Sequence, residues 1–151
     1  MMQHLLTLAR AAIAEGEVPI AACVVAGDGT VLAEAHNAVE ARGDATAHAE
    51  LVAIQRACAV RGEKYLEDCT LIVTLEPCAM CAQAASHVKL RKIIFGAYDV
   101  KSGGVEHGAR VFSHATCHHV PEIIGGVMAA ECGAMLTEFF QEKRGATTNS
   151  S

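Results

Sequence analysis

Residues 69–81 read CTLIVTLEPCAMC, and this stretch decides the fold. Residues 69–75 are mostly apolar or β-branched, a composition typical of a strand buried on both faces. Pro77 follows two residues later and is well placed to open a helix, because a helix start needs no backbone N–H from it. We therefore predict a strand over 69–75 and a helix from Cys78 to about Val88.

The flanking sequence continues this alternation of strands and helices. Apolar runs rich in β-branched residues predict further strands at 19–26, 31–35, 92–97 and 120–124. Amphipathic spacing predicts helices at 3–15, 47–61 and 128–143, with Thr46 capping the second and Gly62 ending it, and residues 37–46 form a loop. Strands that alternate with helices favour an α/β layer arrangement with some parallel pairing.

Composition indicates one folded domain. Apolar residues make up 52% and charged residues 19% of the 151 residues, which is typical of a globular chain. We assign residues 1–144 to the domain and expect the low-complexity segment 145–151 (GATTNSS) to be a flexible tail. No apolar run reaches the roughly 18 residues of a membrane helix. The first ten residues do not resemble a signal peptide, so we expect a cytoplasmic protein.

Seven cysteines, an odd number, suit a reducing compartment in which each is a buried small residue or a metal ligand. Two strings stand out, His48-Ala49-Glu50 and Pro77-Cys78-Ala79-Met80-Cys81. Cys78 and Cys81 share one helix face at this spacing, and a helix start favours thiolates. With His48 they make three ligands and leave a fourth tetrahedral position open, which is typical of a catalytic zinc site.

Glu50 lies two residues beyond a ligand, so it is close to the metal without having to bind it. A carboxylate there can take a proton from water, deliver it to a ring nitrogen of a nucleobase, and then protonate the departing amine. The paired strings match the signature of zinc-dependent nucleobase deaminases.

Two simpler interpretations compete with this site. A lone Cys-x-x-Cys is often a redox pair or half of a structural zinc site, but the chain has no second such pair, and a redox role leaves His48 and Glu50 unexplained. A second group of metal-ligating types, His114, Cys117, His118 and His119, either packs locally or faces RNA, or else holds a structural ion.

The similarity to known deaminases extends beyond the signature. The strings EVPI (17–20), DATAHAE (44–50), TLEPCAMC (74–81) and FGAYDVKSGG (95–104), together with Asn37, resemble the bacterial tRNA-specific adenosine deaminases of the cytidine and deoxycytidylate deaminase superfamily. The resemblance runs from the first helix to about Arg144. TLEPCAMC is shared with deaminases of free bases, whereas the other two longer strings point more narrowly to the tRNA enzymes.

This resemblance implies a three-layer α/β/α cytidine-deaminase-like fold with a mixed central sheet of about five strands, assembled as a homodimer. It also implies one Zn²⁺ per subunit and a tRNA anticodon stem-loop as partner, whose wobble adenosine becomes inosine. By position, His48, Cys78 and Cys81 match the metal ligands and Glu50 the proton shuttle. The substrate-binding positions that match are Val18, Asn37, Ala49 and Asp99.

Two other functions stay open from the sequence. A deaminase of free guanine, cytosine or a nucleoside would share every metal residue, and the formal net charge of −5 gives no bulk attraction to nucleic acid. A non-catalytic zinc-binding domain would leave Glu50 and the open coordination position without a purpose.

Overall fold

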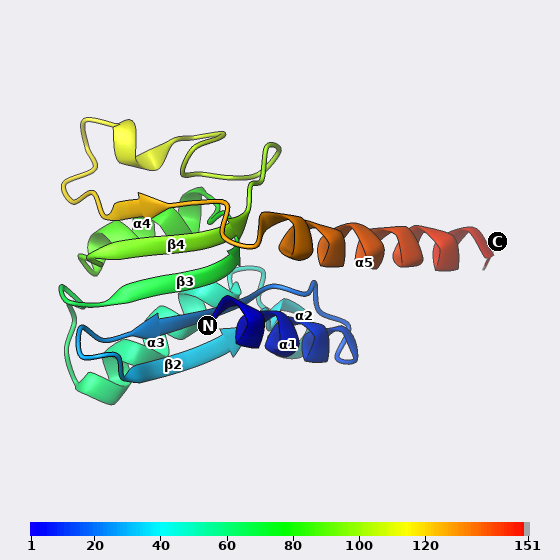
Figure 1. Ribbon diagram of the computed structural model, residues 1–151, viewed down its shortest axis with the longest axis horizontal. Coiled ribbons are helices and arrows are strands. Elements are labelled where there is room, and N and C mark those ends of the chain that lie inside the picture. The colour runs from blue at the N-terminus through cyan, green and yellow to red at the C-terminus, as the bar shows by residue number, and fades with distance from the viewer. Residues whose placement is uncertain (150–151) are drawn as a thin grey trace.

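The computed structural model describes residues 1–149 and is built around one five-stranded sheet (Figure 1). The strands are β1 (Ala21–Val25), β2 (Val31–His36), β3 (Thr70–Leu75), β4 (Lys92–Ala97) and β5 (Glu122–Ile124). They lie in the order β2-β1-β3-β4-β5. β1 is antiparallel to β2 and β3, whereas β4 is parallel to β3 and β5. The predicted mixed sheet of about five strands is confirmed.

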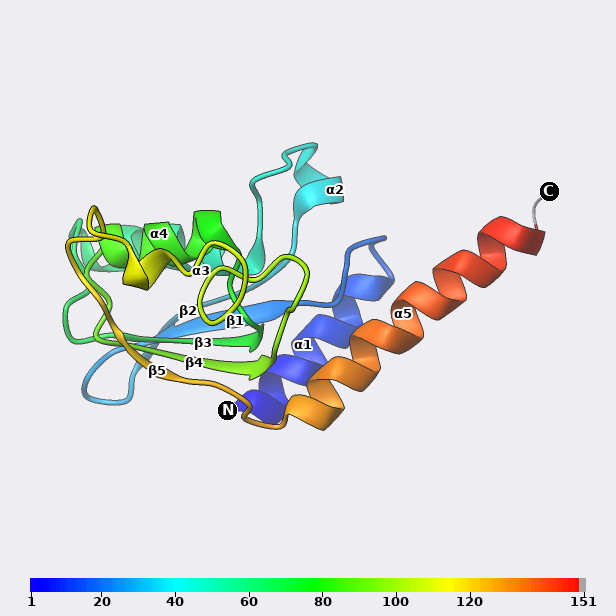
Figure 2. The same cartoon turned by 90° about the horizontal axis from the view of Figure 1, so that it is seen from above.

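Helices cover both faces of the sheet (Figure 2). They are α1 (Met2–Ile13), α2 (Val39–Arg42), α3 (Ala49–Arg61), α4 (Ala79–His87) and α5 (Ala129–Asn149), with a 3₁₀ turn η1 (Val111–Ser113). α3 and α4 lie on one face, and α1 and α5 on the other. Along β1, Ala22 and Val24 belong to the core under α3, and Ala21 and Cys23 to the core under α1 and α5. This explains the apolar composition of the strand, and it confirms the three-layer architecture.

Two helix starts differ from the sequence-based prediction. Pro77 lies one residue before the N-cap, Cys78, so α4 begins at Ala79 rather than at the cysteine. Thr46 does not cap α3, because its Oγ1 bonds to Asp44 and His48 is the N-cap residue. The exposed Asp44 carboxylate accepts hydrogen bonds from both the backbone N–H and the hydroxyl of Thr46, which forms a local turn. A threonine before a helix is expected to cap it, and the sequence pattern does not show whether its hydroxyl bonds to the helix or to such a turn.

Two further boundaries also differ. The predicted loop 37–46 contains the single helical turn α2, whose second and third residues, Glu40 and Ala41, donate their backbone N–H groups to the Glu17 carboxylate at 3.0 and 2.9 Å. α5 continues to Asn149, six residues beyond its predicted end, and Figure 1 shows it extending past the edge of the sheet. The tail expected at 145–151 includes residues 150 and 151, which lie outside the described residues. Among residues 1–149, no helix is long and apolar enough to cross a membrane.

The topology brings the important helix starts to one edge of the sheet. β3 and β4 run in parallel and end at Leu75 and Ala97, and the antiparallel β1 begins at the same edge, where Ala22 is paired with Val73. α4 starts four residues after β3 ends. In open α/β sheets, ligands bind beyond the carboxyl ends of the parallel strands, so this edge is where the site is expected.

Candidate metal centre and substrate cavity

His48, Cys78 and Cys81 come together at this edge, with one ligand atom from each within 4.8 Å of the others. The Nδ1 atom of His48 lies 3.5 Å from Cys78 Sγ and 3.6 Å from Cys81 Sγ. His48 and Cys78 are the N-cap residues of α3 and α4, and Cys81 lies within the first turn of α4. The structure thus assembles the three predicted ligands and identifies Nδ1 as the imidazole atom that faces the sulfurs.

The donor set fits zinc. Tetrahedral zinc bonds of about 2.3 Å to sulfur and 2.0–2.1 Å to nitrogen place those two donors about 3.5 Å apart, which agrees with both measured separations. Two sulfurs and one imidazole nitrogen are ligands that zinc prefers, and a set of three leaves one tetrahedral position for a water or substrate atom. In the described part of the chain, this is the one group of histidine, cysteine and acidic residues positioned to hold a metal.

The pKa values of the two cysteines are shifted in opposite directions, and the shift at Cys78 favours the thiolate that a metal binds. A hydrogen bond from the Cys81 thiol, reinforced by His48, lowers the pKa of Cys78 to about 4 against the opposing effect of burial. The same hydrogen bond to Cys78, together with burial, raises the pKa of Cys81. The hydrogen bond with Cys78 also raises the pKa of His48. The pair therefore keeps one thiolate before metal arrives, and the N-terminal end of α4 favours that charge.

Glu50 lies beside the ligands as the second residue of α3 and is only 4% exposed. Burial raises the pKa of its carboxyl to about 7. Burial thus makes this carboxylate a stronger proton acceptor than a solvated one, which suits a group that takes a proton from water. Glu50 is outside the ligand group, and its proton-transfer role stays a prediction.

A small cavity opens onto these residues, with a volume of about 180 Å³. Its walls come from both halves of the chain: Val18, Ile20, Asn37, His48, Glu50, Leu75, Glu76, Cys78, Asp99 and Ser102. Three predicted substrate residues, Val18, Asn37 and Asp99, line it. The fourth, Ala49, is fully buried and is not among the lining residues.

Asn37 joins the cavity wall to α3. Its Oδ1 accepts a hydrogen bond from the backbone N–H of Ala49 at 2.9 Å, and the residue is 7% exposed. The amide oxygen must face this donor, so the NH₂ group of Asn37 is the part that can donate to a bound molecule. Asn37, which lies outside α3 in the sequence, therefore caps the start of this helix, the role predicted for Thr46.

Sequence reasoning missed Ile20, Leu75, Glu76 and Ser102 as cavity residues. For Glu76, the sequence feature that could have indicated a place in the cavity is its position between the end of the buried strand and Pro77. Burial alone raises the pKa of the Glu76 carboxyl, but hydrogen bonds from His107 and from backbone N–H groups outweigh it and hold the pKa below its ordinary value. Asp99 uses Oδ1 to accept the Ser102 N–H at 2.9 Å, which fixes the turn after β4.

The second group of histidines and a cysteine does not converge on a metal position. His114 Nε2 bonds to the Ala109 carbonyl and His119 Nε2 to the Leu90 carbonyl, both at 2.6 Å. Cys117 Sγ lies 3.4 Å from Ser86 Oγ. These contacts support the local-packing interpretation.

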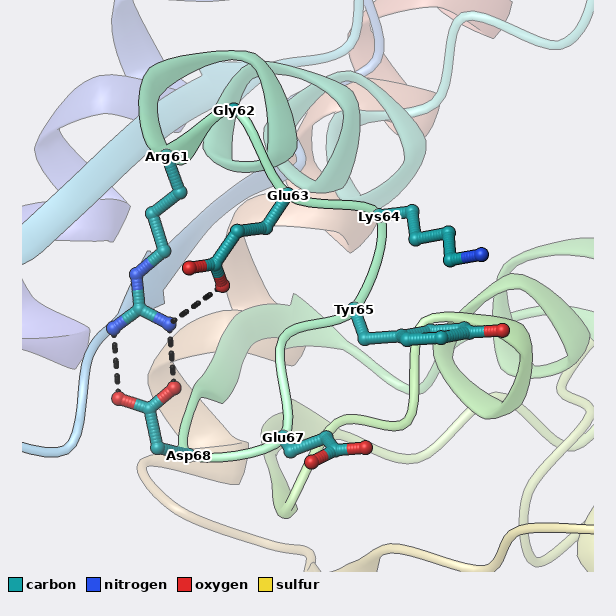
Figure 3. Close-up of a pocket in the computed structure, with 7 residues that line it drawn as sticks. All are labelled: Arg61, Gly62, Glu63, Lys64, Tyr65, Glu67 and Asp68. Atoms are coloured by element: carbon teal, nitrogen blue, oxygen red, sulfur yellow. Dashed lines mark hydrogen bonds and ion pairs between the residues drawn. The ribbon is translucent and has the colours of Figure 1, made fainter.

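A separate hollow of about 630 Å³ lies among residues 61–68, after α3 and before β3 (Figure 3). The Arg61 guanidinium bonds to both carboxylate oxygens of Asp68 at 2.6 and 2.8 Å. The ammonium groups of Lys64 and Lys89 lie over the Tyr65 ring, at 5.2 and 4.5 Å from its centre. None of the predicted site residues lines this hollow.

Comparisons with known proteins agree with this geometry. The family model for the cytidine and deoxycytidylate deaminase zinc-binding region matches residues 1–97. The chain is 45% identical over 143 residues to the tRNA-specific adenosine deaminase of Agrobacterium fabrum, covering 95% of this chain and 93% of the relative. Among solved structures, one from a study of A-to-I editing by tRNA:A34 deaminases at the wobble position is 44% identical, with a TM-score of 0.87 and coverage of 89% and 97%. Guanine deaminase from Bacillus subtilis is 36% identical, with a TM-score of 0.60 and coverage of 64% and 62%.

Proposed function

This chain belongs to the cytidine and deoxycytidylate deaminase family, and from that premise we propose that it is a tRNA-specific adenosine deaminase. It converts the wobble adenosine of a tRNA anticodon to inosine by zinc-dependent hydrolysis. The observation that carries this proposal is the open His48–Cys78–Cys81 triad beside buried Glu50. Its setting is a chain that resembles tRNA deaminases over nearly its full length.

His48, Cys78 and Cys81 would hold the zinc ion, which would supply an activated water whose pKa is lowered to about 7. The two helix starts and the Asn37–Ala49 hydrogen bond hold the ligands in place before substrate arrives.

Glu50 moves the protons. It accepts a proton from the attacking water and delivers it to the ring nitrogen next to the amine-bearing carbon of adenine, which makes that carbon electrophilic. The water oxygen bonds to this carbon, and Glu50 transfers the remaining proton of that oxygen to the amine, which leaves as ammonia. The carbon–nitrogen bond breaks as a carbon–oxygen double bond forms, and Glu50 returns to its starting state.

The cavity selects a single base. The cavity of about 180 Å³ lies directly beside the metal ligands, and enzymes that act on a nucleobase take the target base out of its stack to reach it. Val18 supplies an apolar wall and the Asn37 amide a donor to the base. Asp99 lines the cavity, and its carboxylate is proposed to accept from a ribose 2′-hydroxyl; Ala49 is proposed as a backbone contact.

Two features beyond the single chain are also part of the proposal. We infer a homodimer and a cytoplasmic site of action, as expected for an enzyme that acts on tRNA. Sedimentation of the zinc-loaded protein at twice the chain mass of 15.8 kDa would support the dimer, and sedimentation at the chain mass would contradict it.

The runner-up function is deamination of a free base. The similarity to guanine deaminase favours it less, because the Bacillus subtilis enzyme is 36% identical to this chain, against 44% for the tRNA deaminase structure and 45% for the Agrobacterium fabrum relative. The assay incubates zinc-loaded protein with an anticodon stem-loop RNA that carries adenosine at the wobble position, and separately with free guanine, cytosine and adenosine. Inosine at the wobble position is expected; ammonia from the free compounds alone would reject the tRNA assignment.

The proton-transfer step has its own control. Glu50→Gln preserves the size of the buried side chain and removes its capacity to carry a proton. We expect one zinc ion per chain and a loss of stem-loop deamination of about 10²-fold or more. A Glu50→Gln variant that retained the activity of the unaltered enzyme would contradict the mechanism.

A further inference from the structure

The carboxylate of Glu76 lies directly after β3 and is 2% exposed, yet the reaction as described gives it no task. Five hydrogen-bond donors converge on its two oxygens. Oε1 accepts from the Asp99 backbone N–H at 3.1 Å and from His107 Nδ1 at 2.8 Å. Oε2 accepts from the backbone N–H groups of Val105, Glu106 and His107 at 3.2, 3.0 and 3.1 Å. All five donors belong to the segment that follows β4.

This segment, residues 98–108, is hereafter the β4–η1 loop. It contributes Asp99 and Ser102 to the cavity wall. The loop is pressed closely against its anchor, because a Cβ on Gly103 would overlap the Glu76 carboxylate and one on Gly104 would overlap the backbone of Ala79. The Gly104 N–H also donates to the Pro77 carbonyl at 2.8 Å.

The Glu76 carboxylate therefore connects the zinc ligands with the part of the cavity wall that the β4–η1 loop forms. Through the chain, Glu76 is two residues from the zinc ligand Cys78, and through its hydrogen bonds it holds the backbone of Asp99. A carboxylate that replaces water for five donors in a closed site fixes those groups more firmly than local turn bonds alone would.

We propose that Glu76 is a positioning residue for the deamination reaction. It sets the conformation of the β4–η1 loop, with His107 as its side-chain partner, and thereby the placement of Asp99 and Ser102 against the substrate. The inference rests on the proposed function, and it assigns to Glu76 and His107 a role in substrate binding rather than in the chemical step.

The test begins with Glu76→Gln. The glutamine carbonyl can still serve the three N–H groups at the Oε2 position, which leaves its NH₂ group facing the Asp99 N–H and His107 Nδ1. The imidazole can change tautomer and accept from this NH₂ group, but a backbone N–H cannot. The lost bond is therefore expected to be the one that holds Asp99, which among the residues that donate to Glu76 is the one that lines the cavity.

We expect hydrogen exchange of the Asp99 amide to accelerate at least tenfold in Glu76→Gln. The zinc content should remain at one ion per chain. On the stem-loop RNA, KM should rise at least tenfold while kcat stays within threefold, because His48, Glu50 and the cysteines are unaltered. Loss of zinc, a loss confined to kcat, or kinetics within twofold of the unaltered enzyme would each overturn the proposal.

Asp68→Asn is the matched control. Asp68 also accepts a backbone N–H, from Gly27 at 3.0 Å, and a cationic side chain, Arg61, but it precedes β3 and lines the separate hollow of Figure 3. This variant should leave kcat and KM within twofold. A tenfold rise of KM in Asp68→Asn would show that loss of any anchoring carboxylate produces the effect, and it would overturn the proposal.

His107→Phe provides a second, milder variant in case Glu76→Gln does not fold. Phenylalanine keeps a ring edge against Tyr98, 5.9 Å between centres in the unaltered chain, and removes the Nδ1–H donor. A threefold rise in KM with faster Asp99 exchange is expected, and unchanged values for both would overturn the proposal. Should the unaltered enzyme fail on the stem-loop, the proposed function falls, and the exchange measurement alone decides whether Glu76 holds the loop.

Discussion

Replacing Asn37 by alanine tests which side chain caps the helix that carries His48 and Glu50. Asn37 Oδ1 accepts the Ala49 N–H at 2.9 Å in a buried setting, and that N–H is one of the four donors that a helix start leaves without an internal partner. The cap pattern in the sequence predicts Thr46 for this task instead. Its hydroxyl bonds to Asp44 on the surface.

The magnitude follows from burial. A buried donor left without a partner costs about 1–3 kcal/mol, and loss of a helix N-cap about 0.5–2 kcal/mol, so we expect Asn37→Ala to lower the free energy of unfolding by about 1–2 kcal/mol. For a domain of this size, 1 kcal/mol corresponds to about 2–4 °C in Tm, which gives a fall of about 2–8 °C. Thr46→Ala removes an exposed contact and should cost less than about 0.5 kcal/mol.

Both variants are unfolded thermally at the same excess of zinc, and the zinc Kd of each variant is measured, because bound metal stabilises the folded chain by an amount that depends on the ratio of free zinc to Kd. Urea unfolding with an unchanged m-value would confirm that the native state, not the unfolded chain, is altered. An Asn37→Ala Tm within about 1 °C of the unaltered protein, or an equal fall for Thr46→Ala, would refute the assignment of the cap to Asn37.

Three other variants or treatments test separate parts of the account. Gly96→Ala would place a Cβ against Cys132 Sγ, so we expect the free energy of unfolding to fall by about 1–3 kcal/mol. Gly133→Ala, whose new Cβ has its nearest neighbour at 4.0 Å, should raise the free energy of unfolding by about 0.5–1 kcal/mol. Equal effects of the two variants in thermal unfolding would contradict the close packing at Gly96. In metal-free protein the pKa of Cys78 is lowered to about 4, so its thiolate is present at pH 6. Iodoacetamide should therefore modify Cys78 at pH 6, and added zinc should block this reaction. Modification of Cys78 that begins only near pH 8.5 would contradict the lowered pKa. Asp99→Asn should change the ratio of rates on RNA and DNA stem-loops, because the carboxylate can accept from a 2′-hydroxyl, and an equal proportional loss on both would count against that contact.

Much of the fold was predictable because the signals are local. The predicted strand at 92–97 has the bounds of β4, and the apolar run at 69–75 differs from β3 by one residue. Gly62 ends α3 with φ of 65°, as glycine at that position predicts. Such elements depend on composition and on neighbours within a few residues.

Two of the errors arose where a distant group decides the local structure. α2 is one turn long and depends on the Glu17 carboxylate, 23 residues from Glu40, so no pattern within the loop predicts it. The cap of α3 comes from Asn37, twelve residues before Ala49. Short-range propensity cannot include such partners.

The site shows the same division. The ligand types and the cysteine spacing were readable in the sequence, since the two cysteines lie on one helical turn and the histidine precedes another helix. The role of Glu76 was not, because its five donors follow it by 23 to 31 residues and meet it only when β4 is paired with β3. The short distance between His48 and the two cysteines could likewise not be predicted without the sheet that brings α3 and α4 together.

X-ray absorption at the zinc edge reports the ligands of the bound ion and so decides whether the site is open. We expect one zinc per chain with two sulfur neighbours at about 2.3 Å and two nitrogen or oxygen neighbours at about 2.0–2.1 Å, from His48 and one exchangeable water. A spectrum that requires three or four sulfurs, or a second histidine in place of the water, would show a closed structural site and contradict the account.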